Sequence, residues 1–179
     1  MQNRRDITLI LGGASSGKSA WAERYVLEQG QKVGYIATAQ AFDAEMKEKI
    51  AQHRERRGDE WTTREEPVNI ISCFDAFPAE QPILLDCATL WLSNLMLAEK
   101  NIAAESSAFI DYLHNYTGKL VIVSNEAGLS VIPHTRVGRD FQKAQGQLNQ
   151  QLASLADRVV LIVSGLPLLL KGKLEQQST

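Results

Sequence analysis

Residues 7–19 read ITLILGGASSGKS, and this stretch decides the fold of the chain. Its first five residues are aliphatic or β-branched, which is typical of a buried strand. The rest matches the phosphate-binding pattern G-x-x-x-x-G-K-[ST]. In that pattern glycines let the backbone wrap around phosphate oxygens, and the following helix turns its positive amino terminus toward them. We therefore predict a strand, a phosphate-binding loop and a helix, with nucleotide contacts from Gly12, Gly13, Ala14, Ser15, Ser16, Gly17, Lys18 and Ser19.

The end of this loop also predicts a magnesium site. In the pattern, the lysine (Lys18) reaches the β- and γ-phosphates and the hydroxyl of Ser19 binds Mg²⁺. A second metal ligand is expected at the end of another strand, and the apolar run ILL at 83–85 ends in Asp86. This interpretation makes Ser19 and Asp86 the metal ligands. The alternative, that Asp86 caps the helix predicted to follow it, stays open.

Short apolar runs alternate with longer segments of helical periodicity along the chain. The runs predict strands at 7–11, 33–37, 83–85, 120–123 and 159–163. Between them, helices are predicted at 18–28, 43–57, 88–100, 105–116 and 136–156. This order predicts an α/β doubly wound fold, with a mostly parallel sheet covered by helices on both faces. The segment WTTREEP at 61–67 predicts one further short strand, for which an antiparallel orientation is considered.

Length and charge exclude several classes of protein. The 179 residues suit a single domain, 1–179. Nineteen Lys and Arg against 21 Asp and Glu leave no excess positive charge of the kind that nucleic-acid-binding proteins carry, so no nucleic-acid partner is expected. The two cysteines have no metal-ligand or disulfide spacing. No apolar run is long enough to span a membrane, and we predict a cytoplasmic protein.

The charged segment at 42–57, FDAEMKEKIAQHRERR, holds a candidate nucleophile. On a helical wheel His53 continues the apolar stripe of Phe42, Met46 and Ile50. Histidine can act as a covalent nucleophile, and the arginines that follow it suit phosphate oxygens. From these residues alone, a histidine at a helix end before a solvated basic run explains the segment equally well. Both interpretations of His53 stay open.

A second polar strand end is the sequence Ser124-Asn125-Glu126. In open α/β sheets, ligands bind at the carboxyl ends of the strands. Glu126 either serves such a site or holds the loop at Gly128, and the sequence favours neither. The histidines at 114 and 134 have no comparable neighbours, so we predict that they lie on the surface or in loops.

Several segments together resemble the family of bifunctional adenosylcobinamide kinases/adenosylcobinamide-phosphate guanylyltransferases. The resemblance extends from about residue 7 to about residue 171, and the His-x-x-Arg-Arg segment followed by Trp and Glu-Glu-Pro is its most specific part. Two departures are Ser15, where the family often has Arg, and Gly58, where it often has Pro. The segments are GGASSGKS, YIATAQ, AEMKEKIAQHRERR, WTTREEP, LLDCATLWLSNL, VSNEAGLSVIP, LNQQLASLADRV and SGLPLLLK.

This resemblance implies a RecA-like P-loop domain, assembled as a homotrimer, that catalyses two reactions. The first phosphorylates adenosylcobinamide with ATP or GTP. The second transfers GMP from GTP, through a guanylylated histidine, to adenosylcobinamide phosphate. The family's GMP-carrying histidine corresponds to His53, and with it Lys18 and Asp86 are the implied catalytic residues, with Mg²⁺ as the metal. Further nucleotide contacts are implied for Thr38, Ala39, Gln40, Arg54, Glu55, Arg56, Arg57, Glu65, Asp86 and Thr89.

Two other functions are compatible with the phosphate-binding loop. One is a P-loop kinase of a different small metabolite, in which His53 is a structural helix residue. The other is a non-catalytic nucleotide-binding switch or an ATPase subunit of a larger assembly. A GMP adduct on the protein distinguishes the bifunctional kinase/guanylyltransferase from both alternatives, because neither a simple kinase nor a switch forms such an adduct.

Overall fold

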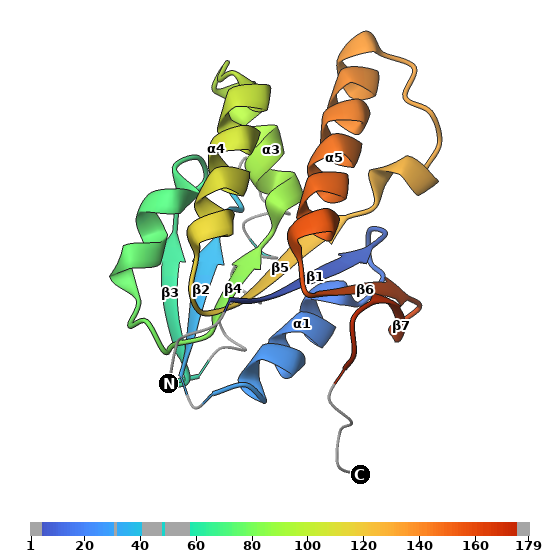
Figure 1. The fold of residues 1–179 in the computed structure, drawn as a ribbon. Helices are drawn as coiled ribbons and strands as arrows, with labels where there is room; N and C mark the ends of the chain where they lie inside the picture. The colour runs from blue at the N-terminus through green and yellow to red at the C-terminus, as the bar shows by residue number, and fades with distance from the viewer. Residues whose placement is uncertain (1–4, 31, 41–47, 49–57, 175–179) are drawn as a thin grey trace.

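A computed structural model describes residues 5–30, 32–40, 48 and 58–174. Within them a seven-stranded sheet runs in the order β3-β2-β4-β5-β1-β6-β7 (Figure 1). Strands β1 to β6 pair in parallel with their neighbours, and β7 pairs antiparallel with β6. The strands are β1 (Asp6–Gly12), β2 (Val33–Ala37), β3 (Trp61–Glu65), β4 (Ile83–Asp86), β5 (Lys119–Asn125), β6 (Arg158–Val163) and β7 (Leu166–Lys171).

Helices cover both faces of the sheet, as predicted. Figure 1 shows α3, α4 and α5 on one face and α1 on the other. The helices are α1 (Lys18–Leu27), α3 (Ala88–Leu97), α4 (Ile102–Asn115) and α5 (Arg136–Leu155), with short 3₁₀ turns η1 (Ile70–Ala76) and η2 (Ala127–Leu129). The helix α4 begins before the predicted residue 105 because the Asn101 side chain caps it, accepting a hydrogen bond from the backbone of Ala104. The helix predicted at 43–57 lies almost wholly outside the described residues.

The structure corrects two features at the edges of the sheet. Strand β3 is parallel to β2, with Val33 opposite Trp61, so the antiparallel orientation considered for it was wrong. Strand β7 was not predicted, because its sequence LPLLLK contains a proline and lacks apolar–polar alternation. It follows β6 through a two-residue turn in which Ser164 and Gly165 have φ of 52° and 78°, the positive values that tight hairpins need.

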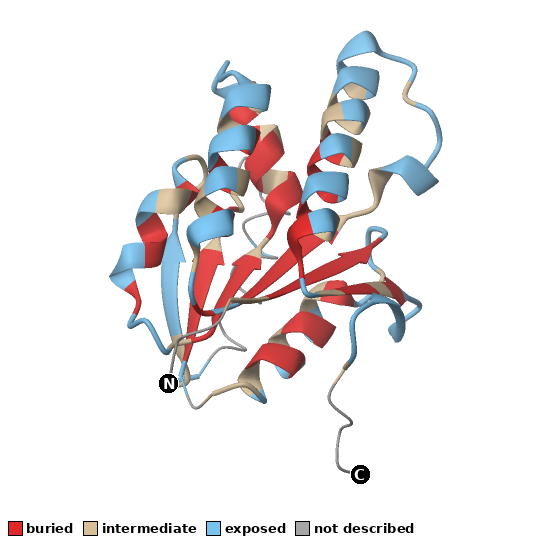
Figure 2. Cartoon of the chain, viewed as in Figure 1, coloured by how far each residue is buried: buried red, intermediate tan, exposed pale blue. Residues whose placement is uncertain are grey.

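Alternate residues of the central strands face the two helical layers. On β5, Leu120 and Ile122 pack in the core beneath α3, α4 and α5, whereas Val121 and Val123 pack in the core against α1. The same alternation holds on β4, where Leu84 faces the α1 layer. Figure 2 shows the central strands buried between the layers. This alternation fixes the face on which each residue at the end of a strand lies.

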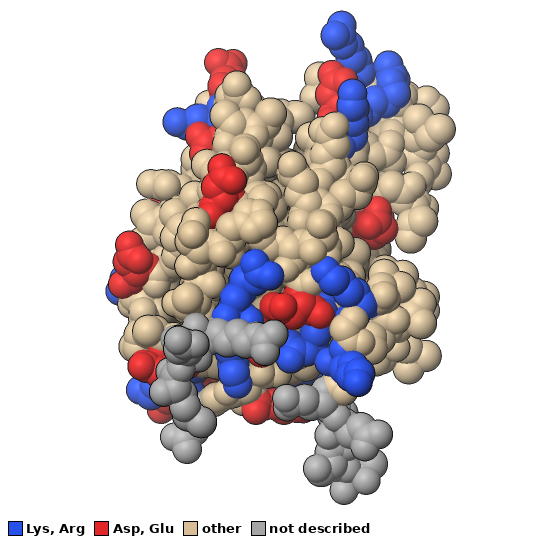
Figure 3. All heavy atoms as spheres, in the orientation of Figure 1, with Lys and Arg blue, Asp and Glu red and all other residues tan. Residues whose placement is uncertain are grey.

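Charged side chains of both signs share the surface. On the face drawn in Figure 3, a group of Lys and Arg side chains lies directly beside acidic ones. One such contact is the ion pair between Arg158 and Asp6 at the start of β1. No helix in the described part of the chain is long and apolar enough to cross a membrane.

Replacing Phe109 by alanine should lower the free energy of unfolding by about 3–5 kcal/mol, because it empties the centre of the larger core. Phe109 is fully buried, and its ring lies 5.2 Å from that of Trp91 and 6.3 Å from that of Phe74. Ser107→Ala, an exposed change on the same helix, is the control and should alter the free energy of unfolding by less than about 0.5 kcal/mol. Equal shifts of the denaturant midpoints of the two variants would contradict this packing.

Candidate active site

The loop that joins β1 to α1 has the backbone shape of a phosphate cradle. A methyl group at Gly12 would collide with the Ser16 hydroxyl and come within 2.8 Å of the Ile162 carbonyl oxygen, so only glycine fits there. Gly17 begins α1 with a φ of 88°, a value that L-residues avoid. The predicted strand, loop and helix are therefore present, and they bring residues 12–19 together at the amino terminus of α1.

The turn between β6 and β7 supports this cradle from outside. The backbone N–H of Gly165 donates a hydrogen bond to the Ser16 carbonyl oxygen over 2.8 Å. The two segments also pack closely, because a Cβ added at Gly17 would lie only 3.3 Å from the Cα of Gly165. Sequence reasoning did not find this support, although the dipeptide Ser164-Gly165 is a turn signal.

Two polar side chains of the cradle are buried beside its backbone. Lys18 is only 9% exposed, and its ammonium group donates a hydrogen bond to the Gly13 carbonyl oxygen over 3.1 Å. The Ser16 hydroxyl is buried and has no hydrogen-bond partner among the residues that the structure describes. A positive charge and an unpaired hydroxyl in one small loop are the groups that phosphate oxygens bind.

Asp86 lies at the carboxyl end of β4 and reaches the cradle. Ser19 donates a hydrogen bond to one carboxylate oxygen over 3.4 Å, and the Tyr35 hydroxyl donates to the other over 2.9 Å. The helix cap considered for Asp86 is instead Cys87, whose sulfur accepts a hydrogen bond from the backbone of Leu90. Burial raises the pKa of the Cys87 thiol to about 12, so this cap is neutral.

The pair Ser19 and Asp86 fits a magnesium ion that is held jointly with a nucleotide. Both side chains offer oxygen, the ligand that Mg²⁺ prefers, and Mg²⁺ commonly takes one or two protein ligands together with substrate phosphates. The described residues contain no cluster of three or more His, Cys, Asp or Glu that would form an all-protein metal site. The donor set therefore suits a metal that arrives with phosphates.

The residues predicted to contact the nucleotide at the carboxyl ends of β2 and β3 lie together at the same edge of the sheet. Glu65 is the last residue of β3 and lies opposite Ala37, just before Thr38, Ala39 and Gln40. Thr38 has no free polar group: its hydroxyl bonds both backbone atoms of Cys87, its N–H donates to the Asp86 carbonyl, and its carbonyl accepts from Asn94. In the sheet, β2, β4 and β5 separate β3 from β1. Asp86 thus lies between this group and the cradle.

Thr89 lies beneath the end of β5 and outside the cradle. Its hydroxyl accepts a hydrogen bond from the Asn125 backbone over 2.7 Å and lies 3.4 Å from the Ser124 hydroxyl. The side chain is 8% exposed, so it is engaged with the protein itself. His53, Arg54, Glu55, Arg56 and Arg57 lie outside the described residues, and the structure does not test them.

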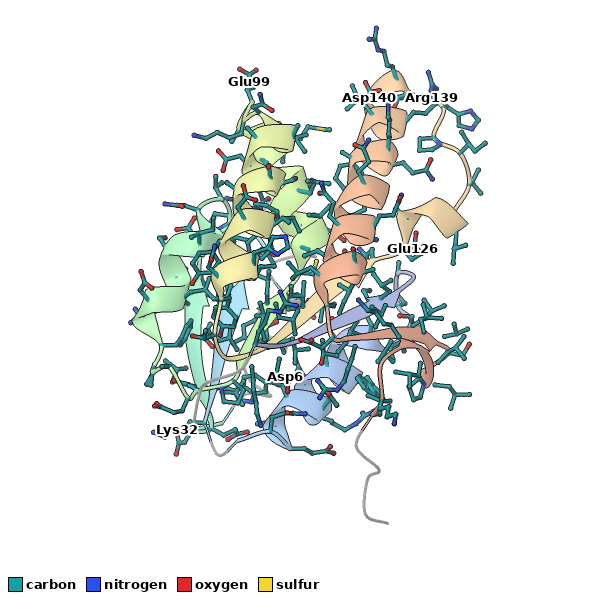
Figure 4. All side chains as sticks on the ribbon, in the orientation of Figure 1. Asp6, Lys32, Glu99, Glu126, Arg139 and Asp140 are labelled. Carbon is teal, nitrogen blue, oxygen red and sulfur yellow. The ribbon has the colours of Figure 1, made fainter. Side chains whose placement is uncertain are left out.

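Glu126 holds the loop that follows β5. Its carboxylate accepts a hydrogen bond from the Gly128 backbone over 3.3 Å and caps the turn η2. In Figure 4 the labelled Glu126 lies in the chain that leaves β5. The predictions for His114 and His134 are confirmed, because one is exposed in the last turn of α4 and the other is exposed in a loop.

These features together define a class of protein. A strand runs into a glycine-rich cradle and a helix, a buried lysine lies in the cradle, and a carboxylate ends a strand that is separated from the first by β5. This is the arrangement of a RecA-like P-loop nucleotide-binding protein.

Within that class, sequence comparison identifies the family. A model of the family described as "Cobinamide kinase / cobinamide phosphate guanyltransferase" (CobU) matches residues 8–170. The bifunctional adenosylcobalamin biosynthesis protein CobP of Pseudomonas aeruginosa is 44% identical over 168 residues, covering 92% of this chain and 97% of the relative. CobU of Escherichia coli K12 is 35% identical over 179 residues, covering 91% and 98%. The chain belongs to this family of bifunctional transferases of cobalamin biosynthesis.

Solved structures agree with the fold at low sequence identity. A protein of Pyrococcus horikoshii OT3 superimposes with a TM-score of 0.56 at 9% identity, over 95% of this chain and 88% of that one. The P4 protein of bacteriophage phi6 in complex with ADP gives a TM-score of 0.50 at 15% identity, over 90% of this chain and 52% of that one. At these identities the similarity shows the fold alone.

Asp86→Asn should slow nucleotide-dependent transfer by about 10²-fold and raise the Mg²⁺ concentration needed for half-maximal rate, because it removes the charge that faces Ser19. Tyr35→Phe should slow the transfer by about 10-fold and also raise the Mg²⁺ requirement, since it removes only the hydrogen bond that orients the carboxylate. Initial rates in a Mg²⁺ titration measure both effects.

Tyr25→Phe is the matched control for these variants. Tyr25 is a buried tyrosine on the same side of the sheet whose hydroxyl faces Thr8 instead of Asp86. If Asp86→Asn needs the same Mg²⁺ concentration as the wild type, Asp86 has a structural role and is not a metal ligand.

Proposed function

We propose that this chain phosphorylates the aminopropanol hydroxyl of adenosylcobinamide with ATP or GTP, and then transfers GMP from GTP to the product through a guanylylated His53. The first reaction releases ADP or GDP, and the second gives adenosylcobinamide-GDP and pyrophosphate. The observation that carries the proposal is the cradle at residues 12–19, joined to Asp86 by the 3.4 Å hydrogen bond from Ser19, in a chain of the cobinamide kinase family.

In the kinase reaction the cradle binds the β- and γ-phosphates through its backbone N–H groups, and Lys18 neutralises part of their charge. The substrate hydroxyl attacks the γ-phosphorus, a new P–O bond forms, and the bond to the β-phosphate oxygen breaks. Mg²⁺, held by Ser19 and Asp86 when it is bound, supplies further charge neutralisation. Positioning and electrostatics account for most of the acceleration of such a transfer.

In the guanylyl transfer the same cradle holds the triphosphate while His53 attacks the α-phosphorus. A P–N bond forms, the bond to the β-phosphate breaks, and pyrophosphate leaves. A phosphate oxygen of adenosylcobinamide phosphate then attacks the same phosphorus and releases the histidine. A neutral imidazole has a free ring nitrogen at pH 7 and needs no base. The arginines Arg54, Arg56 and Arg57 are proposed to bind phosphate oxygens next to His53.

The remaining nucleotide contacts are proposed for the group at the ends of β2 and β3. Ala39 and Gln40 are half-buried and Glu65 is exposed, so they have surface available for a ligand. The polar groups of Thr38 and the Thr89 hydroxyl serve neighbouring residues, and we assign to both the role of holding the ends of β2, β4 and β5. A single domain spanning 1–179, a cytoplasmic location and the lack of a nucleic-acid partner stay predictions.

Self-association as a homotrimer is also part of the proposal. Strand β7 is exposed along its whole length (Figure 2), and Leu166, Leu168 and Leu170 are 70%, 55% and 55% exposed. A contiguous exposed apolar edge favours burial against another chain. The turn before β7 supports the cradle through Gly165, so only the start of this strand adjoins the cradle.

The double variant Leu168→Glu/Leu170→Glu should convert the assembly to monomers, because it places two charges in the apolar contact. Light scattering coupled to size-exclusion chromatography measures the mass. Leu97→Glu is the control, since Leu97 is 66% exposed at the end of α3 and lies on a different element. A monomeric wild-type chain would contradict self-association, and an unchanged mass in the double variant would move the interface away from β7.

His53→Ala should abolish the GMP adduct and keep adenosylcobinamide phosphorylation, because hydroxyl attack on the γ-phosphorus needs no imidazole. Incubation with α-labelled GTP, followed by intact-protein mass measurement, detects the adduct, and a second assay follows phosphorylation with ATP. Lys18→Ala should lose both reactions by about 10²–10³-fold, whereas His114→Ala, at an exposed site, should keep both. A persistent adduct in His53→Ala would remove His53 from the mechanism.

A further inference from the structure

Asn125, the last residue of β5, lies next to the phosphate cradle. Strand β5 lies between β1, which leads into the cradle, and β4, which ends in Asp86. Asn125 is paired with Gly12 across the sheet, and the next N–H along the chain, that of Glu126, donates to the Gly12 carbonyl oxygen over 3.0 Å. Asn125 is therefore at the same sheet edge as both halves of the proposed site.

Strand alternation places the Asn125 side chain on the face of the cradle. Val121 and Val123 face the α1 layer, so Asn125, two residues further on, faces the same way. By the same alternation from Leu84, Asp86 also faces α1, which agrees with its contact to Ser19 on that helix. Asn125 thus lies on the strand between Gly12 and Asp86 and shares their face.

The backbone of Asn125 is held by side chains from the opposite face. Its N–H donates to the Thr89 hydroxyl over 2.7 Å, and its carbonyl accepts from the Asn149 amide over 2.9 Å. Asn149 is itself bonded by Ser124 and Gln145, each through its side chain. A buried polar network of this kind rigidifies what it holds, and its effect here is to fix Asn125.

The side-chain oxygen of Asn125 has no hydrogen-bond partner in the described part of the chain, although it is buried. The Ser16 hydroxyl, beside Gly12, is likewise buried and has no hydrogen-bond partner among the described residues. Buried polar atoms are nearly always paired, so an unpaired acceptor beside a phosphate cradle calls for a donor from a ligand. An amide oxygen accepts hydrogen bonds and has no charge to repel phosphates.

We propose that Asn125 is a catalytic residue of the phosphorylation step: its amide oxygen accepts the hydrogen bond of the substrate hydroxyl and turns the hydroxyl oxygen toward the γ-phosphorus. This inference rests on the proposed kinase function. The P–O bond forms to the oriented oxygen, the bond to the β-phosphate breaks, and the hydroxyl proton leaves to a phosphate oxygen or water, since the amide takes no proton. The guanylylation of a histidine involves no hydroxyl, and Asn125 is not needed for it.

The test compares both reactions in Asn125→Ala. The kcat of adenosylcobinamide phosphorylation should fall about 10²-fold, the size typical of one lost hydrogen bond to a reacting group. The KM for ATP and the rate of GMP adduct formation should stay within about threefold of wild type. The Tm should not fall, because the removed oxygen makes no hydrogen bond to any residue that the structure describes.

Two further variants separate orientation from structure. Asn125→Asp keeps an acceptor of the same shape, so it should recover part of the kcat and give the kinase an added acidic limb in its pH profile. Asn149→Ala breaks the network beneath and is the structural control: it should lower the Tm and slow both reactions together.

Two results would overturn the proposal. They are a kinase kcat within about threefold of wild type in Asn125→Ala, and an equal loss of both reactions with a lowered Tm in the same variant. If the wild-type chain does not phosphorylate adenosylcobinamide, the proposed substrate fails instead. Hydrolysis of ATP, in which water takes the place of the hydroxyl, then tests Asn125 by the same comparison.

Discussion

The close approach of Ser16 and Ile162 to Gly12 is the constraint on which the site depends. The space that a side chain at Gly12 would fill is taken by the Ser16 hydroxyl and by the Ile162 carbonyl oxygen of β6. The loop can therefore curl tightly over the end of β1 only while that position has no Cβ. Because Gly165, in the turn that follows β6, also donates a hydrogen bond to the Ser16 carbonyl oxygen, the shape of the cradle depends on β1, β6 and the β6–β7 turn together.

The order of the strands then determines what faces the cradle. A parallel sheet gathers the carboxyl ends of its strands at one edge, and β5 and β4 follow β1 there in turn. Asn125 and Asp86 consequently stand at increasing distance across the sheet from Gly12, on one face. The group at the ends of β2 and β3 continues the same edge beyond Asp86. The sheet thus orders the site in a line from the phosphate loop to the contacts proposed beyond Asp86.

The sequence predicted the parts of this site that depend on local pattern. The cradle and the strand ending in Asp86 were found because a motif and an apolar run are contiguous in the chain. Tyr35 and Gly165 were missed because their roles come from pairing: Tyr35 reaches Asp86 only through the β2–β4 register. The nucleotide contact predicted for Thr89 stays a prediction, but the sequence did not predict the hydrogen bond that its hydroxyl accepts from the Asn125 backbone, 36 positions further along the chain. Local patterns contain no information on such contacts.

The two proposed transfers, each from its own bound triphosphate, use two different attacking groups. Both proposed reactions need the charge of the phosphates held in the same way, so we propose that the cradle, Lys18 and the pair of Ser19 and Asp86 are common to them. They differ in the attacking group: a hydroxyl needs an acceptor to orient its O–H, whereas a neutral imidazole attacks with a lone pair already directed in the ring plane. The roles proposed for the Asn125 amide in the first transfer and for His53 in the second would meet these different requirements without changing the cradle. The buried network beneath Asn125 agrees with this proposal, because an acceptor that serves only one reaction has to be oriented by the protein and not by the nucleotide.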